Sequence, residues 1–226
     1  MEPTEENRRA FDQLHGQRIE SASGGPAIPD AVRALLPDLR EKHVLHLLCG
    51  TGEASGELAA LGGLVTGVGV SADALAVARE NHPEVAFVQA DVHELPLQLQ
   101  RHRIDFVYVG GGVLRTVDDL DVLTSGVANA LRPGGRLLLW DTHPVLECVD
   151  PASLRWVEDY FEGVLATGPR LGEQQEVRLW TLGQVVNAVV RAGFVVRGLE
   201  EFPSPAPVRR HDPRLPGGFA LGADKH

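Results

Sequence analysis

The sequence has few cysteines and no long apolar segment. Its only two cysteines are Cys49 and Cys148, and they form no CxxC pair and no framework of the kind that stabilises secreted domains. We therefore expect a reducing, cytoplasmic location. No run of about 18 apolar residues occurs. The N-terminus, MEPTEENRRAFDQ, is acidic and polar where a signal peptide is basic and then apolar, so we expect a soluble protein that is neither exported nor held in a membrane.

Positive charge is also scarce. The chain has 21 Lys and Arg against 31 Asp and Glu, which gives a formal net charge of −10. The arginines are scattered, so the chain would repel a phosphate backbone, and we do not expect nucleic acid as a partner. With 226 residues, 43% of them hydrophobic, we expect a single domain over residues 1–226.

Apolar runs and helical patterns alternate along the chain. Helical spacing of apolar residues, with Asp30 and Ser71 as N-caps, predicts helices at 30–40, 53–62, 71–82, 119–131 and 181–193. Apolar and β-branched runs predict strands at 44–49, 64–70, 85–91, 104–109, 136–140, 194–200 and 218–224. RPGG at 132–135 is typical of a turn.

This alternation predicts an α/β fold with a doubly wound, mostly parallel sheet. Such sheets bind ligands beyond the carboxyl ends of their strands. The site should therefore lie in the turns that follow residues 49, 69, 91, 109 and 140. The last two strands are joined by a polar, proline-rich segment without a helical pattern. This connection favours a hairpin, which makes the last strand antiparallel.

Five segments together resemble the ordered motifs of the class I S-adenosylmethionine-dependent methyltransferases. They are VLHLLCGTG, LGGLVTGVGVSADALAVAR, VAFVQADVHELP, IDFVYVGGGVL and LRPGGRLLLWDTHP. The resemblance runs from about residue 30 to the C-terminus. It implies a seven-stranded Rossmann-like methyltransferase sheet and S-adenosylmethionine as cofactor. The Asn/Asp-Pro-Pro-aromatic motif of nucleobase and glutamine methyltransferases is absent, which favours a small-molecule acceptor, as in bacterial relatives with a His-Pro pair after the fifth strand.

The resemblance also assigns the cofactor site. The turn Gly50, Thr51 and Gly52 would lie against the amino-acid part of the cofactor, and Asp91 would accept from the adenine amino group beside the backbone N–H of Val92. The full set implied by the resemblance is His46, Cys49, Gly50, Thr51, Gly52, Gly69, Val70, Ser71, Asp91, Val92, Gly110, Gly111 and, from the N-terminal segment, Arg18. The alternatives are a plain tight turn at the glycines and an acid that only caps the next turn.

Three positions in this site depart from the family pattern. The family usually has an acid at His46, a glycine at Leu48 and a ribose-binding acid at Gly69. We expect Leu48 to narrow the approach to the backbone and Gly69 to remove two hydrogen bonds, with Ser71 and Asp73 as partial substitutes. A second hypothesis follows: a non-catalytic member of the fold that has weak or no cofactor binding and acts as an interaction module. A NAD-dependent enzyme fits less well, because the closing antiparallel strand and LRPGG do not belong to that pattern.

Methyl transfer needs a base only if the acceptor must lose a proton. His143 is our first candidate, since it follows a strand at its carboxyl end, and Tyr160, His15 and Glu147 are others. The alternative for His143 is a turn residue that bonds the backbone. We predict no metal, because Asp141 alone does not form the acidic cluster of metal-dependent relatives.

Two segments are expected to control the acceptor. Residues 1–29 are interpreted as a helical cap, with Phe11, His15 and Arg18 near the cofactor. Residues 145–180 are interpreted as a lid-like insertion after the fifth strand, over an apolar or aromatic acceptor. It contains four of the twelve aromatic residues, namely Trp156, Tyr160, Phe161 and Trp180. A satellite core or a homodimer contact are alternatives for the lid.

Overall fold

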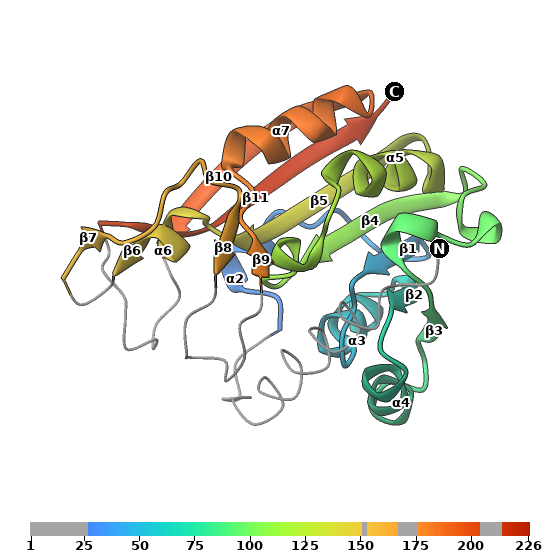
Figure 1. Cartoon of the computed structure of the whole chain (residues 1–226). Coiled ribbons are helices and arrows are strands. Elements are labelled where there is room, and N and C mark those ends of the chain that lie inside the picture. Colours follow the sequence, from blue (N-terminus) through green and yellow to red (C-terminus); the bar gives the residue numbers. More distant parts are fainter. Residues whose placement is uncertain (1–26, 151–152, 167–175, 204–213) are drawn as a thin grey trace.

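The computed structural model describes residues 27–150, 153–166, 176–203 and 214–226 (Figure 1). Most of the expected N-terminal cap, residues 1–26, lies outside the described residues, and so do its candidate residues Phe11, His15 and Arg18.

A seven-stranded sheet forms the centre of the molecule, in the order β10-β11-β5-β4-β1-β2-β3. Its strands are β1 (His43–Leu47), β2 (Leu64–Gly69), β3 (Ala86–Gln89), β4 (Ile104–Gly110), β5 (Leu131–Thr142), β10 (Phe194–Pro203) and β11 (Pro216–Lys225). The first five pair in parallel. β11 pairs antiparallel with both β10 and β5, so it is the second strand from one edge. The predicted fold class is confirmed, including the antiparallel last strand.

Helices cover both faces of this sheet (Figure 1). They are α2 (Asp30–Arg33), α3 (Glu53–Ala60), α4 (Ala72–Asn81), α5 (Leu120–Ala130) and α7 (Leu182–Arg191). In Figure 1, α5 and α7 lie above the sheet and α3 and α4 below it. Short 3-10 turns follow two strands, namely η1 (Val92–Glu94) and η2 (Leu97–Leu99) after β3, and η3 (Leu114–Thr116) after β4.

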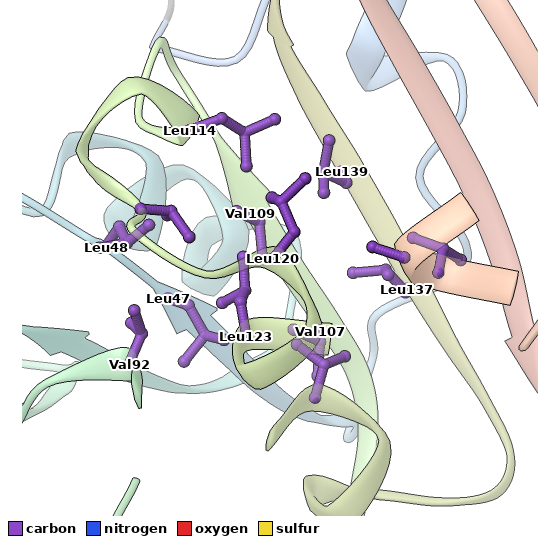
Figure 2. Packing of buried hydrophobic residues seen from close by; sticks show 14 of the residues in the cluster. Leu47, Leu48, Val92, Val107, Val109, Leu114, Leu120, Leu123, Leu137 and Leu139 are labelled. Carbon is purple, nitrogen blue, oxygen red and sulfur yellow. The ribbon is translucent and has the colours of Figure 1, made fainter. Parts of the chain in front are cut away.

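Two hydrophobic clusters hold these layers together. The larger one packs α5 and α7 on the sheet, and Figure 2 labels ten of its residues: Leu47, Leu48, Val92, Val107, Val109, Leu114, Leu120, Leu123, Leu137 and Leu139. The second packs α2 and α3 on the other face, around Val44, Phe106 and Tyr108. Neighbouring residues of a strand point to opposite faces. For this reason the continuous apolar runs in the sequence supply both clusters.

The helix starts follow the sequence closely. Ser71 caps α4 by accepting from the N–H of Ala74. Asp119 caps α5. Thr181 and Gln184 form a capping box at α7. Side-chain acceptors satisfy N–H groups that have no partner within the helix, which makes these boundaries readable in the sequence.

Two predicted boundaries are wrong. The helix expected at 30–40 ends at Arg33, and its N-cap is Pro29 rather than Asp30. Pro37 disfavours the helical conformation at the residue before it, so the apolar spacing that follows Arg33 does not continue the helix. β5 begins at Leu131, before the turn expected at 132–135. Gly134 has φ of +73° there, and the pairing with β4 shifts between Ile104 and Phe106.

The segment after β5 contains short elements. These are α6 (Val145–Cys148), β6 (Val149–Asp150), β7 (Arg155–Trp156), β8 (Val164–Ala166) and β9 (Glu176–Arg178). β6 pairs antiparallel with β7, and β8 with β9. Its role as a lid stays a prediction.

Candidate functional site

The carboxyl ends of the parallel strands meet along one edge of the sheet. Leu47 of β1 pairs with Val68 of β2 and with Val109 of β4. Gly69 pairs with Gln89, and Gly110 with Trp140. The turns that follow residues 47, 69, 89, 110 and 142 therefore lie side by side, as the alternating pattern predicts for a ligand site.

The turn after β1 is built on left-handed backbone. Leu48, Gly50 and Gly52 have φ values of 58°, 54° and 88°. The turn is closed by a hydrogen bond of 3.0 Å from the N–H of Gly52 to the carbonyl of Cys49. Gly52 is also the N-cap of α3, and a Cβ there would lie 2.9 Å from Cζ of Phe87. Glycine is required at this position. The turn is buried, and it lies at a helix start, where backbone N–H groups favour an anionic group.

Leu48 takes the left-handed conformation that glycine adopts more easily. For a leucine this conformation costs about 1 to 2 kcal/mol. Its side chain is buried in the larger core cluster, where Figure 2 shows it near Val92. The side chain points into the core, so it does not cover the turn in the way the sequence led us to expect.

His46 is buried at the end of β1. Its Nδ1 lies 2.7 Å from Oγ of Ser55 in α3, and its ring meets Tyr108 edge-on at 5.2 Å between centroids. Burial lowers the pKa of His46 to about 3, so the imidazole is neutral where the family has a carboxylate. Tyr108 is in turn hydrogen-bonded by Nε1 of Trp140, whose indole covers Gly110.

Gly69 ends β2 with room for a side chain. A Cβ there would lie 3.5 Å from Sγ of Cys49 and from Cδ2 of Leu75, and the backbone is not left-handed. The hydroxyl of Ser71 accepts from the N–H of Ala74 at 3.1 Å, so one of its lone pairs already serves α4. Val70 lies between them, and its carbonyl accepts from Nε2 of Gln89 at 3.0 Å.

Asp91 follows β3 and caps η1. Its Oδ1 accepts from the backbone N–H of His93 at 2.9 Å and lies 2.8 Å from Nδ1 of the same residue. The side-chain bond to His93 lowers the pKa of Asp91, and the bond to Asp91 raises the pKa of His93. Capping therefore takes place. Both bonds use Oδ1, and among the described residues no hydrogen bond to Oδ2 is seen.

A pocket with both apolar and charged lining residues lies at the ends of β4 and β5. It has about 400 Å³ of empty space, partly open to solvent, and is lined by Gly112, Leu114, Arg115, Asp141, Thr142, Pro144, Glu147, Arg178, Leu179, Trp180 and Phe219. A Cβ at Gly112 would lie 3.9 Å from Oδ1 of Asp141. The pocket thus begins where the turn after β4, part of the expected cofactor site, ends.

Asp141 is a buried charged group of this pocket, and Arg115 is a partly buried one, with 29% of its side chain accessible. Asp141 accepts from the N–H of Leu114 at 2.7 Å and of Thr142 at 2.6 Å, and burial raises its pKa to about 6. Nε of Arg115 is buried and has no hydrogen-bond partner among the described residues. Its NH1 lies 3.8 Å from Oε1 of Glu147.

The two proposed bases have structural partners. Nε2 of His143 lies 2.9 Å from Oε1 of Glu201, and its Nδ1 accepts from the N–H of Val145 at 3.2 Å. Burial lowers the pKa of His143, against the opposing effect of Glu201. The hydroxyl of Tyr160 accepts from the N–H of Leu182, at 3.0 Å. This geometry favours a turn role for His143 and a helix-capping role for Tyr160, and their catalytic roles stay predictions.

The four aromatic residues of the insertion separate into two pairs. Trp180 lines the pocket and donates from Nε1 to the carbonyl of Val117 at 2.9 Å. Tyr160 packs on Cys148 and Leu179. Trp156 and Phe161 are 62% and 82% exposed. The ring of Phe161 meets that of Tyr160 edge-on at 5.2 Å between centroids, and Trp156 pairs with Val149 in the short sheet of β6 and β7.

Sequence reasoning missed Arg115 and considered Asp141 only as a metal ligand. Asp141 lies at the carboxyl end of β5 and Arg115 in η3, which follows β4, and this position near strand ends was the available signal. Among the described residues, no group of three or more His, Cys, Asp or Glu is placed to hold a metal ion, and no helix is long and apolar enough to cross a bilayer. Burial raises the pKa of Cys49 to about 12 and that of Cys148 to about 11, so both thiols are protonated and unreactive.

Comparisons with known proteins give the same class as the geometry. Residues 44–135 match the family model described as a methyltransferase domain. An S-adenosylmethionine-dependent methyltransferase from Mesorhizobium loti superposes with a TM-score of 0.72 at 26% identity, over 89% of this chain and 99% of that one. The chain therefore has the fold of the class I S-adenosylmethionine-dependent methyltransferases, and its residues 44–135 are similar to the methyltransferase domain of that family model. The resemblance seen in the sequence is confirmed.

Curated relatives match over shorter stretches. An uncharacterized methyltransferase of Synechocystis is 36% identical over 44% of this chain and 47% of its own length. An O-methyltransferase of Penicillium expansum is 28% identical over 65% of this chain and 55% of its own length. The chain thus spans about half the length of these relatives.

Proposed function

We propose that the protein transfers a methyl group from S-adenosylmethionine to a small-molecule acceptor. The observation that carries this proposal is the shared edge of the sheet: the glycine turn after β1, Gly69 and Asp91 lie along it, and it opens at Gly112 into a separate pocket. We call the row formed by the turn Gly50–Gly52, Gly69 and Asp91 the cofactor strip. Methyl transfer requires a bound cofactor next to a bound acceptor, and a cofactor strip that leads to an acceptor pocket provides this arrangement.

The residues present fit the cofactor. The turn Gly50–Gly52 would hold the amino-acid part at the start of α3. Gly69 and Ser71 would face the ribose, while Oδ2 of Asp91 and the N–H of Val92 would bind adenine. The cofactor supplies the electrophilic methyl group. The chain binds, orients the acceptor and excludes water.

The chemical nature of the acceptor, the cellular location and the oligomeric state are further parts of this proposal. Trp180 and Phe219 line the pocket, which supports an acceptor with an apolar or aromatic part. The net charge of −10 supports an acceptor other than nucleic acid. We also propose a cytoplasmic location, and a homodimer in which the exposed Trp156 and Phe161 would become buried.

The second candidate is a non-catalytic interaction module with the same fold. The neutral His46 and the missing carboxylate at Gly69 favour it, because both remove charge from the cofactor strip. The two candidates differ in one measurable property, the binding of the cofactor product.

Calorimetry with S-adenosylhomocysteine tests the proposal. We expect the wild-type protein to bind it. Asp91→Asn should raise the Kd roughly tenfold or more. The amide oxygen can still accept from the His93 N–H, but the NH2 group that replaces Oδ2 is a donor and cannot accept from the adenine amino group. Asp38→Asn, at an exposed acid that pairs with Arg40, is the matched control and should bind normally. Absence of binding by the wild type would favour the interaction module.

A further inference from the structure

The pocket beyond Gly112 combines an apolar wall with the buried Asp141 and the partly buried Arg115. Leu179, Trp180 and Phe219 form the apolar side, while Arg115 and Asp141 are on the polar side. Glu147 and Arg178 also line it, but they are more exposed, with 39% and 45% of their side chains accessible. The four charges cancel when Asp141 is ionised, so the pocket fits a molecule that carries both a donor group and an anionic group.

Arg115 has an unmet need for an acceptor. The guanidinium is always charged and presents five donors. Its Nε is buried without a hydrogen-bond partner among the described residues. Oε1 of Glu147 lies 3.8 Å from NH1, beyond hydrogen-bond distance. A buried donor without a partner costs free energy, and an oxyanion of a ligand in the pocket would satisfy it.

Asp141 supplies the opposite function. Backbone N–H groups of Leu114 and Thr142 hold one oxygen each, so the carboxylate is fixed in orientation. The backbone N–H of Val113 is a third donor to Asp141. An ionised carboxylate has about four lone-pair sites, so about one is left. It can accept from a hydroxyl or amino group, and the carboxylate lies beside Gly112, where the expected cofactor strip ends.

We propose that Arg115 and Asp141 recognise an acceptor that carries both an oxyanion, such as a carboxylate, and a hydroxyl or amino group on an aromatic or apolar body. Arg115 donates to the oxyanion, Asp141 accepts from the hydroxyl or amino group, and Trp180 and Phe219 contact the body. That the ligand is the methyl acceptor rests on the proposed function, whereas the recognition itself does not.

The three hydroxybenzoate isomers are suitable probes, with phenol and benzoate as analogues that each lack one group. Binding is measured by calorimetry at about pH 8, where Asp141 is ionised, on the protein with and without S-adenosylhomocysteine. We expect at least one isomer to bind roughly tenfold more tightly than either analogue, because it makes both polar contacts.

Four variants assign these contacts. Arg115→Gln should abolish the tighter binding of that isomer relative to phenol, which lacks the carboxylate. Asp141→Asn should abolish its tighter binding relative to benzoate, which lacks the hydroxyl. Glu147→Gln should strengthen benzoate binding, because it removes a competing negative charge. Arg132→Gln changes an arginine that pairs with Asp105 outside the pocket, and it should change none of these affinities.

The outcomes separate the two proposals. The recognition is wrong if no isomer exceeds both analogues, or if Arg115→Gln leaves the preference over phenol intact. If Asp141→Asn does not fold, the comparison of Arg115→Gln with Arg132→Gln still tests the recognition, through the preference for the isomer over phenol. Failure to bind S-adenosylhomocysteine would contradict methyl transfer, while the titrations of the free protein would still test the pocket.

Discussion

At the scale of single residues, Gly69 is the clearest departure from the family that can be tested. The structure shows that a Cβ would make ordinary contacts of 3.5 Å there, and that the backbone is not left-handed. Aspartate is therefore compatible with the local conformation. A glycine that could be replaced without strain leaves the ribose side of the strip without a charged acceptor.

We expect Gly69→Asp to increase the affinity for S-adenosylhomocysteine roughly tenfold, a gain of about 1.4 kcal/mol, because ribose hydroxyls would donate to a carboxylate. Gly69→Asn is the matched control with a smaller gain, since neutral hydrogen bonds are weaker. Calorimetry on the three proteins measures both effects. Equal affinities for all three would mean that Ser71, Asp73 or water already satisfies the ribose.

The sequence predicted which edge of the sheet carries the expected site residues, but not their local hydrogen-bond partners. Alternating strands and helices place residues 50–52, 69 and 91 on one edge, because parallel strands end together. The pairing of Asp91 with His93 and of His46 with Ser55 depends on the geometry of a 3-10 turn and of a helix face. Such contacts depend on backbone turns whose shape the residue types alone do not specify.

At the scale of elements, the sequence predicted some helix and strand boundaries and missed others. Helices with side-chain caps were predicted to within two residues, as at Ser71 and Asp119, because capping is a local interaction. The predicted end of the helix at 30–40 was wrong, because apolar spacing alone does not show where a helix ends. The hairpins of the insertion were missed because two- and three-residue strands carry little alternation.

The connection between the insertion and α7 gives a prediction at this scale. Tyr160→Phe removes the hydroxyl that accepts from the N–H of Leu182, and we expect a loss of about 1 kcal/mol of unfolding free energy. Tm should fall by roughly 2 to 4 °C for a chain of this size. Trp156→Phe, at a side chain 62% exposed, is the control and should leave Tm unchanged.

Thermal unfolding followed by circular dichroism measures this effect, and S-adenosylhomocysteine titration accompanies it. The affinity should be the same in both variants, because neither residue lies on the cofactor strip. A large loss of cofactor affinity in Tyr160→Phe at unchanged Tm would contradict the helix-capping role and indicate that this residue contacts the cofactor.

At the scale of the whole molecule, two buried ionisable groups make stability depend on pH in opposite directions. The pKa of His46 is lowered from 6.5 to about 3, so the unfolded chain binds the extra proton and stability falls as pH falls from 6.5 towards 3. The pKa of Asp141 is raised from 3.8 to about 6. The native state binds that proton, so its contribution is complete below 3.8 and is lost as pH rises through 6.

Between pH 3.8 and 6 the two contributions oppose each other. Each proton changes the unfolding free energy by about 1.4 kcal/mol per pH unit at most. The wild-type protein should therefore show a flatter pH dependence in this range than either group would produce alone, although its other carboxylates add their own slopes. Removing one of the two groups should expose the slope of the other.

We expect His46→Asn to be stabilised relative to the wild type as pH falls from about 6 to 4, by an amount that grows by roughly 1 kcal/mol per pH unit. Asparagine retains a hydrogen bond to Ser55 but cannot take up the proton. Asp141→Asn should show the opposite trend, losing stability relative to the wild type over the same range. Urea unfolding at several pH values measures the differences, in which the slopes of unrelated carboxylates cancel. Parallel curves for the wild type and His46→Asn would show that the imidazole reaches solvent and titrates normally, which would contradict its burial beneath α3.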